Sequence, residues 1–313
     1  MPPAKHAEIQ NVIDTLDRRV LQGKERALRL SLIALLAGGH ILLEDIPGLG
    51  KTTLALALSA ALGLSFGRIQ CTSDLLPSDI TGLSIYERDT GRFRFVKGPI
   101  FNNILLADEI NRAMPKTQSA MLEAMEERRV TVEGTTYPLP DPFLVIATQN
   151  PVEQVGTYPL PESQLDRFLI ATGVGYPPED LEKAIIKGGG IREEIRDIAP
   201  LVSREDLLAA RRTVRETIQV GDRLVDYIYR LVAATREHPY ILSGLSTRGA
   251  ISLAAAARAA AFLDRRDYVI PEDVQLVAAP VGAHRIILRP QHETLAKPEV
   301  LQSIVASVPI PRA

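Results

Sequence analysis

Short apolar runs alternate with stretches of helical periodicity along the first half of the chain. Four of these runs have the length and composition of buried strands: 40–44, 104–107, 143–148 and 168–173. Between them, the stretch from Lys51 to Leu62 is apolar or small almost throughout, and another helix is predicted to begin at Pro115. Strands that alternate with helices predict an α/β fold, with a parallel sheet covered by helices on both faces.

The pattern becomes helical after Tyr176-Pro177-Pro178. One helix is predicted to begin after Ser203, and two more are predicted over 222–237 and 248–264. At the other end of the chain, residues 4–37 are also predicted to form helices. We therefore expect two domains, an α/β core over 1–177 and a helical domain over 178–313. Gly188-Gly189-Gly190 is expected to form a joint inside the second domain.

Two segments of alternating residues predict β-hairpins that interrupt the α/β pattern, at 82–97 and at 129–139. The first hairpin carries Arg88, Arg92 and Arg94, which are candidates for contacting a partner protein or a nucleic acid. An exposed hairpin with alternating charges and no such role is an equally good interpretation.

Composition and charge exclude several classes of protein. The chain has 313 residues, of which 46% are hydrophobic and 24% charged, which excludes a disordered protein. The formal net charge of −2 gives no electrostatic reason to expect nucleic acid as the main partner. A single cysteine, Cys71, excludes an internal disulfide and is expected to be a small buried side chain. No apolar stretch reaches the ~18 residues of a membrane span, and a cytoplasmic location is expected.

The segment Ile46-Pro-Gly-Leu-Gly-Lys-Thr-Thr53 lies between a predicted strand and a predicted helix, where a Gly-rich turn exposes backbone N–H groups to phosphate oxygens. Lys51 is expected to reach the β- and γ-phosphates, and Thr52 to bind Mg²⁺. The candidate cofactor-binding residues are Asp45, Pro47, Gly48, Leu49, Gly50, Lys51, Thr52 and Thr53.

Asp45 stands where the phosphate-loop pattern has its first glycine. Because a carboxylate close to a triphosphate weakens its binding, Asp45→Gly is expected to tighten nucleotide binding.

Two acidic residues follow the buried run at 104–107. A strand that ends in Asp108 and Glu109 delivers both carboxylates to the carboxyl edge of the sheet, where α/β folds bind ligands. Asp108 is expected to hold Mg²⁺ through its waters, and Glu109 to orient and deprotonate the attacking water.

Three further residues are candidates for contact with the γ-phosphate. Asn150 ends the third buried run and is placed to orient the water, although Asn before Pro151 is also a common turn. Arg167 is the candidate for an arginine supplied by a neighbouring subunit, its alternative being a local salt bridge. Arg248 opens a helix of the second domain, where it either reaches the γ-phosphate or is solvated.

Together these residues resemble the AAA+ ATPases, and more closely their MoxR branch, over about residues 20 to 290. The resemblance is carried by three stretches: Arg68 to Gly82 (RIQCTSDLLPSDITG), Gly98 to Ala113 (GPIFNNILLADEINRA) and Gly156 to Phe168 (GTYPLPESQLDRF). It implies a P-loop AAA+ core with β-hairpin inserts and a smaller all-α lid domain.

The resemblance also implies a role for each candidate residue: a Walker A loop at 45–52, a Walker B motif at 104–109, sensor 1 at Asn150, an arginine finger at Arg167 and sensor 2 at Arg248. It implies ATP and Mg²⁺ as cofactors and a homo-oligomer, typically a ring hexamer. The implied partner is a protein client, in some cases a von Willebrand factor A domain protein.

Three functions follow in order of preference. The first is an ATP hydrolase that couples turnover to the remodelling, maturation or activation of a client. The second is a scaffold that binds ATP and assembles with little turnover, which Asp45 favours and Lys51, Glu109 and Arg167 oppose. The third is a nucleic-acid motor, which the near-neutral charge disfavours.

Overall fold

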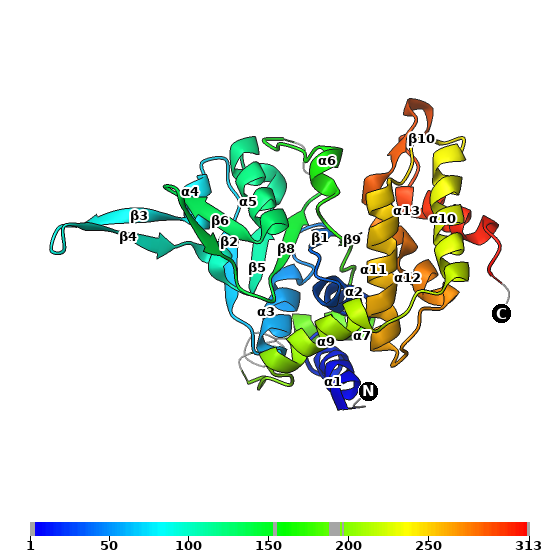
Figure 1. Ribbon diagram of the computed structural model, residues 1–313, viewed down its shortest axis with the longest axis horizontal. Helices are drawn as coiled ribbons and strands as arrows, with labels where there is room; N and C mark the ends of the chain where they lie inside the picture. Colours follow the sequence, from blue (N-terminus) through cyan, green and yellow to red (C-terminus); the bar gives the residue numbers. More distant parts are fainter. Residues whose placement is uncertain (1–3, 153–154, 188–194, 196, 312–313) are drawn as a thin grey trace.

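The computed structural model describes residues 4–152, 155–187, 195 and 197–311. The expected joint at Gly188–Gly190 lies outside these residues. Figure 1 shows a central sheet with helices around it, a group of helices beside it formed by the second half of the chain, and a long two-stranded arm on the opposite side.

The central sheet has five parallel strands in the order β2-β5-β8-β1-β9. The four predicted strands are present as β1 (Ile41–Glu44), β5 (Ile104–Asp108), β8 (Leu144–Gln149) and β9 (Ile170–Thr172). The fifth, β2 (Phe66–Gln70), was not predicted and forms the edge next to β5. The expected parallel sheet is therefore confirmed, with one more strand than the sequence indicated.

Alternate residues of the central strands point into two separate apolar cores. Leu105 and Val145 pack on one face with the helices α4 (Pro77–Thr81) and α5 (Pro115–Glu127). Leu106 and Ile146 pack on the other face with α1 (Ala4–Arg19), α2 (Glu25–Leu36) and α3 (Lys51–Ala61). Burial on both faces explains why these strands are continuous apolar runs.

The second half of the chain is mainly helical, as expected. Its helices are α6 (Glu162–Leu165), α7 (Glu179–Ile186), α9 (Arg204–Glu216), α10 (Asp222–Glu237), α11 (Thr247–Leu263), α12 (Pro271–Gly282) and α13 (Lys297–Ser307). Ser203 caps α9 by accepting from the backbone N–H of Asp206 at 3.1 Å, as its position predicted. The apolar core that contains α1, α2 and α3 continues into α9–α13, so these helices are packed firmly against the sheet region.

A small ribbon accompanies these helices. The strands β10 (Ile241–Ser243) and β11 (Ile287–Leu288) pair antiparallel, and neither was predicted from the sequence. Short 3₁₀ segments complete the elements: η1 (Pro99–Phe101), η2 (Ile110–Arg112), η3 (Ala283–Arg285) and η4 (Pro290–His292). Within the described residues, no helix combines the length and apolar character that a bilayer crossing requires.

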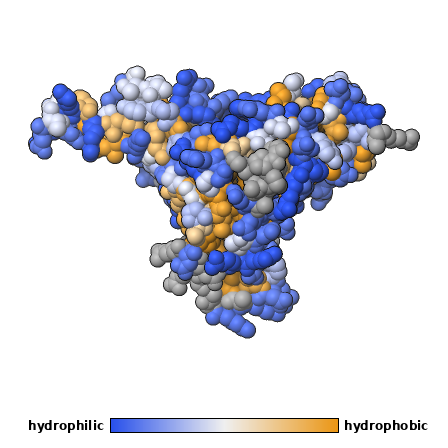
Figure 2. All heavy atoms as spheres, turned by 60° about the horizontal axis from the view of Figure 1, so that its bottom comes forward, coloured by the Kyte–Doolittle hydropathy of each residue, from blue (hydrophilic) through white to orange (hydrophobic). Residues whose placement is uncertain are grey.

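Both predicted hairpins are present. The strands β3 (Gly82–Glu87) and β4 (Arg92–Lys97) form the arm that projects from the sheet in Figure 1, and β6 (Arg129–Val132) pairs with β7 (Thr135–Pro138) near its base. The ring of Phe95 stacks on that of Tyr137 at 4.2 Å, which ties the two hairpins together. Apolar side chains remain exposed along the arm (Figure 2): Leu83, Ile85, Tyr86, Phe93 and Val96.

Cys71 lies directly after β2 and is buried in the core on the α5 side of the sheet. Burial raises the pKa of its thiol to about 12, so the side chain stays neutral. The prediction of a small buried side chain is confirmed.

Candidate nucleotide site

A polar cavity of about 300 Å³ opens at the carboxyl ends of the strands, beside the first turn of α3. We call it the phosphate pocket. Its walls come from the Gly-rich turn after β1, the ends of β2 and β5, and the end of β8. The lining residues are Pro47, Gly48, Gly50, Lys51, Thr52, Thr53, Arg68, Gln70, Asp108, Glu109, Thr148, Gln149 and Asn150.

The turn before α3 contains two residues in the left-handed backbone conformation, and both are glycines. Gly48 and Gly50 have φ values of 89° and 85°, a left-handed conformation that side chains with a Cβ rarely adopt. Lys51 folds back over this turn, and its Nζ donates to the carbonyl oxygens of Asp45 at 2.6 Å and Ile46 at 2.9 Å. Burial lowers the pKa of Lys51, with Asp45 and Asp108 acting in the opposite direction. The lysine therefore sits where the bare N–H groups of the turn and of α3 converge.

Asp45 does not line the phosphate pocket. Its Oδ2 accepts hydrogen bonds from the backbone N–H groups of Val174 and Gly175, the latter at 3.1 Å, and so joins the end of β1 to the segment after β9. The side chain is thus turned away from the phosphate pocket, which argues against its lying close to a triphosphate.

Asp108 is 7% exposed and lies at the floor of the phosphate pocket. Its Oδ2 accepts from Arg68 Nε at 2.8 Å, and its Oδ1 accepts from the Thr148 hydroxyl at 3.4 Å. Thr52, in the first turn of α3, lines the same pocket. A hydroxyl, a carboxylate and added phosphate oxygens are ligands that suit Mg²⁺, and the guanidinium against Asp108 shows that this carboxylate already attracts a cation.

Glu109 follows β5 with a φ of 57°, which is unusual for a residue with a side chain. Its backbone N–H donates to Thr148 Oγ1 at 2.9 Å, and its Oε2 accepts from Gln70 at 3.1 Å and from Arg112 at 3.3 Å. The strained backbone is thus held by contacts from two neighbouring strands, and the carboxylate has a defined orientation.

Asn150 lies at the end of β8 and lines the phosphate pocket with both acids. Its Oδ1 accepts from the backbone N–H of Val152 at 3.2 Å, so the turn interpretation of this residue is also borne out. Sequence reasoning did not identify Arg68, Gln70 or Thr148. Gln70 and Arg68 belong to β2, which was not predicted, whereas Thr148 was in a predicted strand and its hydroxyl gave no separate signal.

Arg167 and Arg248 lie outside the phosphate pocket and next to each other. Arg167 Nε is 3.3 Å from Glu126 Oε2, and Arg248 contacts Glu126 Oε1 at 3.3 Å and Asp166 Oδ2 at 3.4 Å. We call this surface the arginine face. Arg285, which is 4% exposed, supports it from behind by donating to Asp166 Oδ1 at 2.6 Å and to the Phe168 carbonyl at 2.7 Å. The structure therefore separates the two arginines from the pocket of their own chain.

The profile of the ATPase family associated with various cellular activities (AAA) matches residues 40–170, and that of the AAA lid domain matches residues 233–304. The chain is 40% identical to Chaperone MoxR1 of Mycobacterium tuberculosis, covering 99% of this chain and 86% of that protein. The chain belongs to the MoxR family of AAA+ ATPases.

Two further comparisons support this MoxR-family assignment. The chain is 48% identical to the protein YeaC of Bacillus subtilis, covering 94% of this chain and 92% of YeaC. A crystal structure of a protein from Cytophaga hutchinsonii that was assigned as an ATPase superposes with a TM-score of 0.89 at 42% identity, covering 99% of this chain and 96% of that one. The AAA+ core with hairpin inserts and the helical lid expected for a MoxR protein are thereby confirmed.

Proposed function

We propose that this MoxR-family protein is a Mg²⁺-dependent ATP hydrolase that works as a ring and uses turnover to remodel a protein client. The observation that carries the proposal is the convergence of Lys51 and Thr52 from α3 with Asp108 and Glu109 from β5 in one pocket. These four residue types at one strand edge are the parts that phosphoryl transfer to water requires.

The triphosphate is proposed to bind over the turn at 47–50, where backbone N–H groups and the N-terminus of α3 favour negative charge. Lys51 then exchanges its two carbonyl acceptors for anionic phosphate oxygens. Charge-assisted hydrogen bonds are about twice as strong as neutral ones, so this exchange favours binding.

The nucleoside is proposed to occupy a second cavity of about 570 Å³ that is lined in part by Glu44 and Asp45, at the end of the strand that leads into the Gly-rich turn. Its walls come from Gly23 and Lys24 before α2, from the segment 171–175 around the end of β9, and from α12. A cavity shared by the core and the lid lets the lid position respond to the bound nucleotide.

Thr52 and Asp108 are proposed to hold Mg²⁺, which when bound neutralises charge on the phosphate oxygens. Glu109 orients the attacking water and accepts its proton, and Asn150, on the same side of the pocket, holds that water in line. Gln70 and Arg112 position the Glu109 carboxylate by the hydrogen bonds described above.

The arginine face is proposed to complete the pocket of a neighbouring protomer. Arg167 and Arg248 are absent from the lining of their own phosphate pocket, and both are held by Glu126 at the surface. A second chain can bring this pair of positive charges to a γ-phosphate, where a guanidinium stabilises the charge of the transition state. A closed ring, expected to be a hexamer, repeats this contact at every interface.

The proposed client is a protein, in keeping with the chaperone name of the M. tuberculosis relative. A von Willebrand factor A domain protein is the candidate that the MoxR resemblance suggested. The arm formed by β3 and β4 supports a client role because it extends away from the core and exposes apolar side chains and arginines together. We place this activity in the cytoplasm.

The Glu109→Gln variant tests the proposed hydrolysis. Losing the general base while keeping the binding groups is expected to leave the ATP dissociation constant within about twofold and to lower steady-state phosphate release about 10³-fold. Phosphate release by the wild type is expected to rise more steeply than protein concentration as the ring assembles. The matched control, Glu123→Gln on the exposed side of α5, should keep full turnover.

Nucleotide binding and assembly without measurable phosphate release by the wild type would contradict the hydrolase and support the scaffold. Full turnover in Glu109→Gln would remove Glu109 from the reaction.

A further inference from the structure

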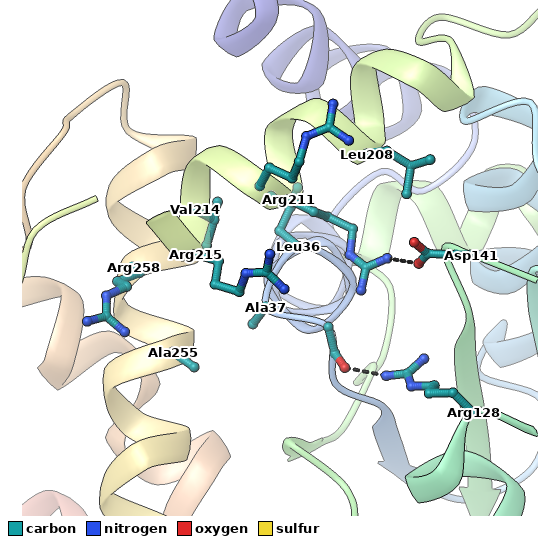
Figure 3. A pocket seen from close by; sticks show the side chains of 12 residues that line it. Leu36, Ala37, Arg128, Asp141, Leu208, Arg211, Val214, Arg215, Ala255 and Arg258 are labelled. Carbon is teal, nitrogen blue, oxygen red and sulfur yellow. Dashed lines mark hydrogen bonds and ion pairs between the residues drawn. The ribbon is translucent and has the colours of Figure 1, made fainter. Parts of the chain in front are cut away.

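Another polar cavity, of about 530 Å³, lies at the C-terminal end of α2 and shares no lining residue with the phosphate pocket. We call it the basic cavity. Figure 3 shows it between the C-terminal end of α2, the side of α9 and the helix α11. Arginines dominate its polar lining: Arg128, Arg211, Arg212, Arg215 and Arg258.

One acidic residue, Asp141, faces these five arginines in the cavity lining. Its carboxylate is bound by Arg211 Nη1. Arg215 is paired with its chain neighbour Glu216 at 2.5 Å, where both side chains are largely exposed. Within the described part of the chain, neither Arg212 nor Arg258 forms a salt bridge. The lining therefore carries a large excess of positive charge.

Arg128 is held in place from behind, and Arg211 keeps a buried donor without a partner among the described residues. Arg128 donates to the carbonyl oxygens of Phe143 at 2.6 Å and of Gly38, and its guanidinium lies 5.6 Å from the centre of the Phe143 ring. Burial, and then the charge of Arg211, lower the pKa of Arg128 to about 10. The Nε of Arg211 is buried and has no hydrogen-bond partner among the described residues. The site thus holds preorganised guanidinium groups and leaves a buried donor unsatisfied.

Structural roles account for only part of this charge. The C-terminal end of α2 carries a partial negative charge, which Arg128 meets through Gly38, and Asp141 balances Arg211. These two partners leave Arg215, Arg212 and Arg258 without a counter-charge inside the cavity. Clustering several guanidinium groups is costly unless an anion lies between them.

We propose that the basic cavity binds a small organic phosphate that carries at least two phosphate groups. The planar guanidinium donors of Arg211 and Arg215 suit phosphate oxygens. The lining also includes the apolar side chains of Leu36, Leu208, Val214 and Ala255, which provide contact for the organic part of the ligand. A cavity of this size is in the range of small-molecule sites and much larger than a lone phosphate ion needs.

The position of the basic cavity gives such a ligand a structural effect. Gly38, Arg128 and Asp141 belong to the sheet region, whereas Arg211 and Arg215 lie on α9 and Ala255 lies on α11. A ligand that contacts both groups ties the helical part of the chain to the sheet region. It is therefore expected to raise the thermal midpoint of unfolding as well as to bind.

Calorimetric titration of the full-length Lys51→Ala protein with adenosine 3′,5′-bisphosphate tests this proposal, because that background weakens the phosphate pocket and the probe lacks a polyphosphate chain. We expect one site per chain, with an affinity that falls as salt rises. Adding Arg215→Gln or Arg211→Gln should weaken binding about tenfold or more, since each removes charge-assisted hydrogen bonds. The matched control, Arg230→Gln on the exposed surface of α10, should bind like its parent.

Arg215 is exposed and pairs only with its chain neighbour among the described residues, so Arg215→Gln is expected to fold even if Arg211→Gln does not. Absence of binding at millimolar probe, or unchanged affinity in a folded Arg215→Gln protein, would overturn the proposal. Citrate in a parallel titration distinguishes the ligand class: binding as tight as that of the bisphosphate would replace the organic phosphate by a polycarboxylate and overturn it in this form.

Discussion

The phosphate pocket and the arginine face contain complementary charges, and their charged side chains lie in different surroundings. In the pocket, Asp108 and Glu109 are held by hydrogen bonds and face a cavity of about 300 Å³. On the arginine face, Arg167 and Arg248 lie at the surface and are held by Glu126. Among the described residues, the arginine that lines the pocket, Arg68, is paired with Asp108, and the arginine face includes no phosphate-binding turn.

This difference supports our proposal that each region supplies half of one site. An arginine that pairs with an exposed carboxylate gains little from the pair, about 0–1 kcal/mol, and can exchange it for a phosphate at low cost. Within one chain, neither Arg167 nor Arg248 is among the residues that line the phosphate pocket. Two chains arranged head to tail can bring the two halves together with both regions as they are.

The Arg167→Ala variant tests most directly whether the arginine face acts on the pocket of a neighbouring chain. It is expected to bind ATP normally and to lose about 10³-fold in turnover, because a transition-state charge is missing. Mixed with an equal amount of Lys51→Ala protein, which is inactive by itself, it should regain activity, since about one quarter of randomly formed interfaces join an intact pocket to an intact arginine face. Phosphate release by the two proteins, separately and mixed, is the measurement.

Two results would refute the two-chain site. Arg167→Ala rings could keep full turnover, which would remove Arg167 from the reaction. Alternatively, a mixture whose subunits demonstrably exchange could stay inactive, which would place both halves in one chain. Arg129→Ala, an exposed arginine on the β6 hairpin, is the matched control and should neither lose activity nor need rescue.

The Lys51→Ala variant tests whether the phosphate pocket binds ATP without the arginine face. Removing the ammonium deletes charge-assisted contacts to the phosphates and is expected to weaken ATP binding at least about 100-fold. Titration calorimetry of the isolated chain at a concentration below assembly measures this effect without the arginine face. The control is Lys116→Ala on the exposed surface of α5, and equal ATP affinity in both variants would show that nucleotide does not bind beside Lys51.

The sequence predicted the parts of the fold whose pattern is set locally. Runs buried on both faces, such as Ile104–Asp108, are continuous and apolar, so β5 and its neighbours were found. The strand β2 was not, because Phe66–Gln70 has only two large apolar side chains, separated by a glycine and an arginine, and lies at an edge of the sheet. The two-residue strand β11 depends on its pairing with Ile241–Ser243, which no local pattern reports.

Within the candidate site, the sequence predicted which residues take part but not where each side chain points. Lys51, Asp108 and Glu109 follow strands whose ends must meet, and the pocket brings them together as expected. The direction of Asp45 depends on backbone N–H groups about 130 residues away in the chain, at Val174 and Gly175. Likewise, the separation of Arg248 from its own pocket results from lid packing, which sequence spacing does not reveal.

The Asp45→Gly variant tests whether Asp45 lies outside the phosphate pocket. The sequence predicted tighter nucleotide binding in this variant, and the structure predicts equal or weaker binding. Because the carboxylate accepts from Val174 and Gly175, its removal should destabilise the protein by about 1–2 kcal/mol and leave ATP affinity equal or weaker. Chemical denaturation and calorimetry measure the two effects. Asp89→Gly, at the tip of the arm, is the control for adding a glycine. Tighter ATP binding in Asp45→Gly would restore the original interpretation.

The last comparison is between two buried histidines, one at the amino end of β1 and one behind the arginine face. His40 lies under the sheet, where its Nδ1 accepts from the Val145 N–H at 3.0 Å and its Nε2 contacts the Met125 carbonyl at 3.2 Å. His284 lies behind the arginine face, 2.9 Å from the Phe168 carbonyl, and its Nδ1 is buried without a hydrogen-bond partner among the described residues. Burial lowers the pKa of each ring to about 3.

The folded protein therefore keeps both rings neutral, whereas the unfolded chain protonates them near pH 6.5. Between about pH 6.5 and about pH 3 the unfolded state binds more protons, so stability falls as the pH decreases, by up to about 1.4 kcal/mol per pH unit for each ring. Denaturation between pH 7.5 and 5 should show a flatter decline in His40→Gln and in His284→Gln than in the wild type. His292→Gln gives the baseline for losing a ring that is not buried. A decline as steep as that of the wild type in His284→Gln would mean that this ring is not kept neutral behind the arginine face.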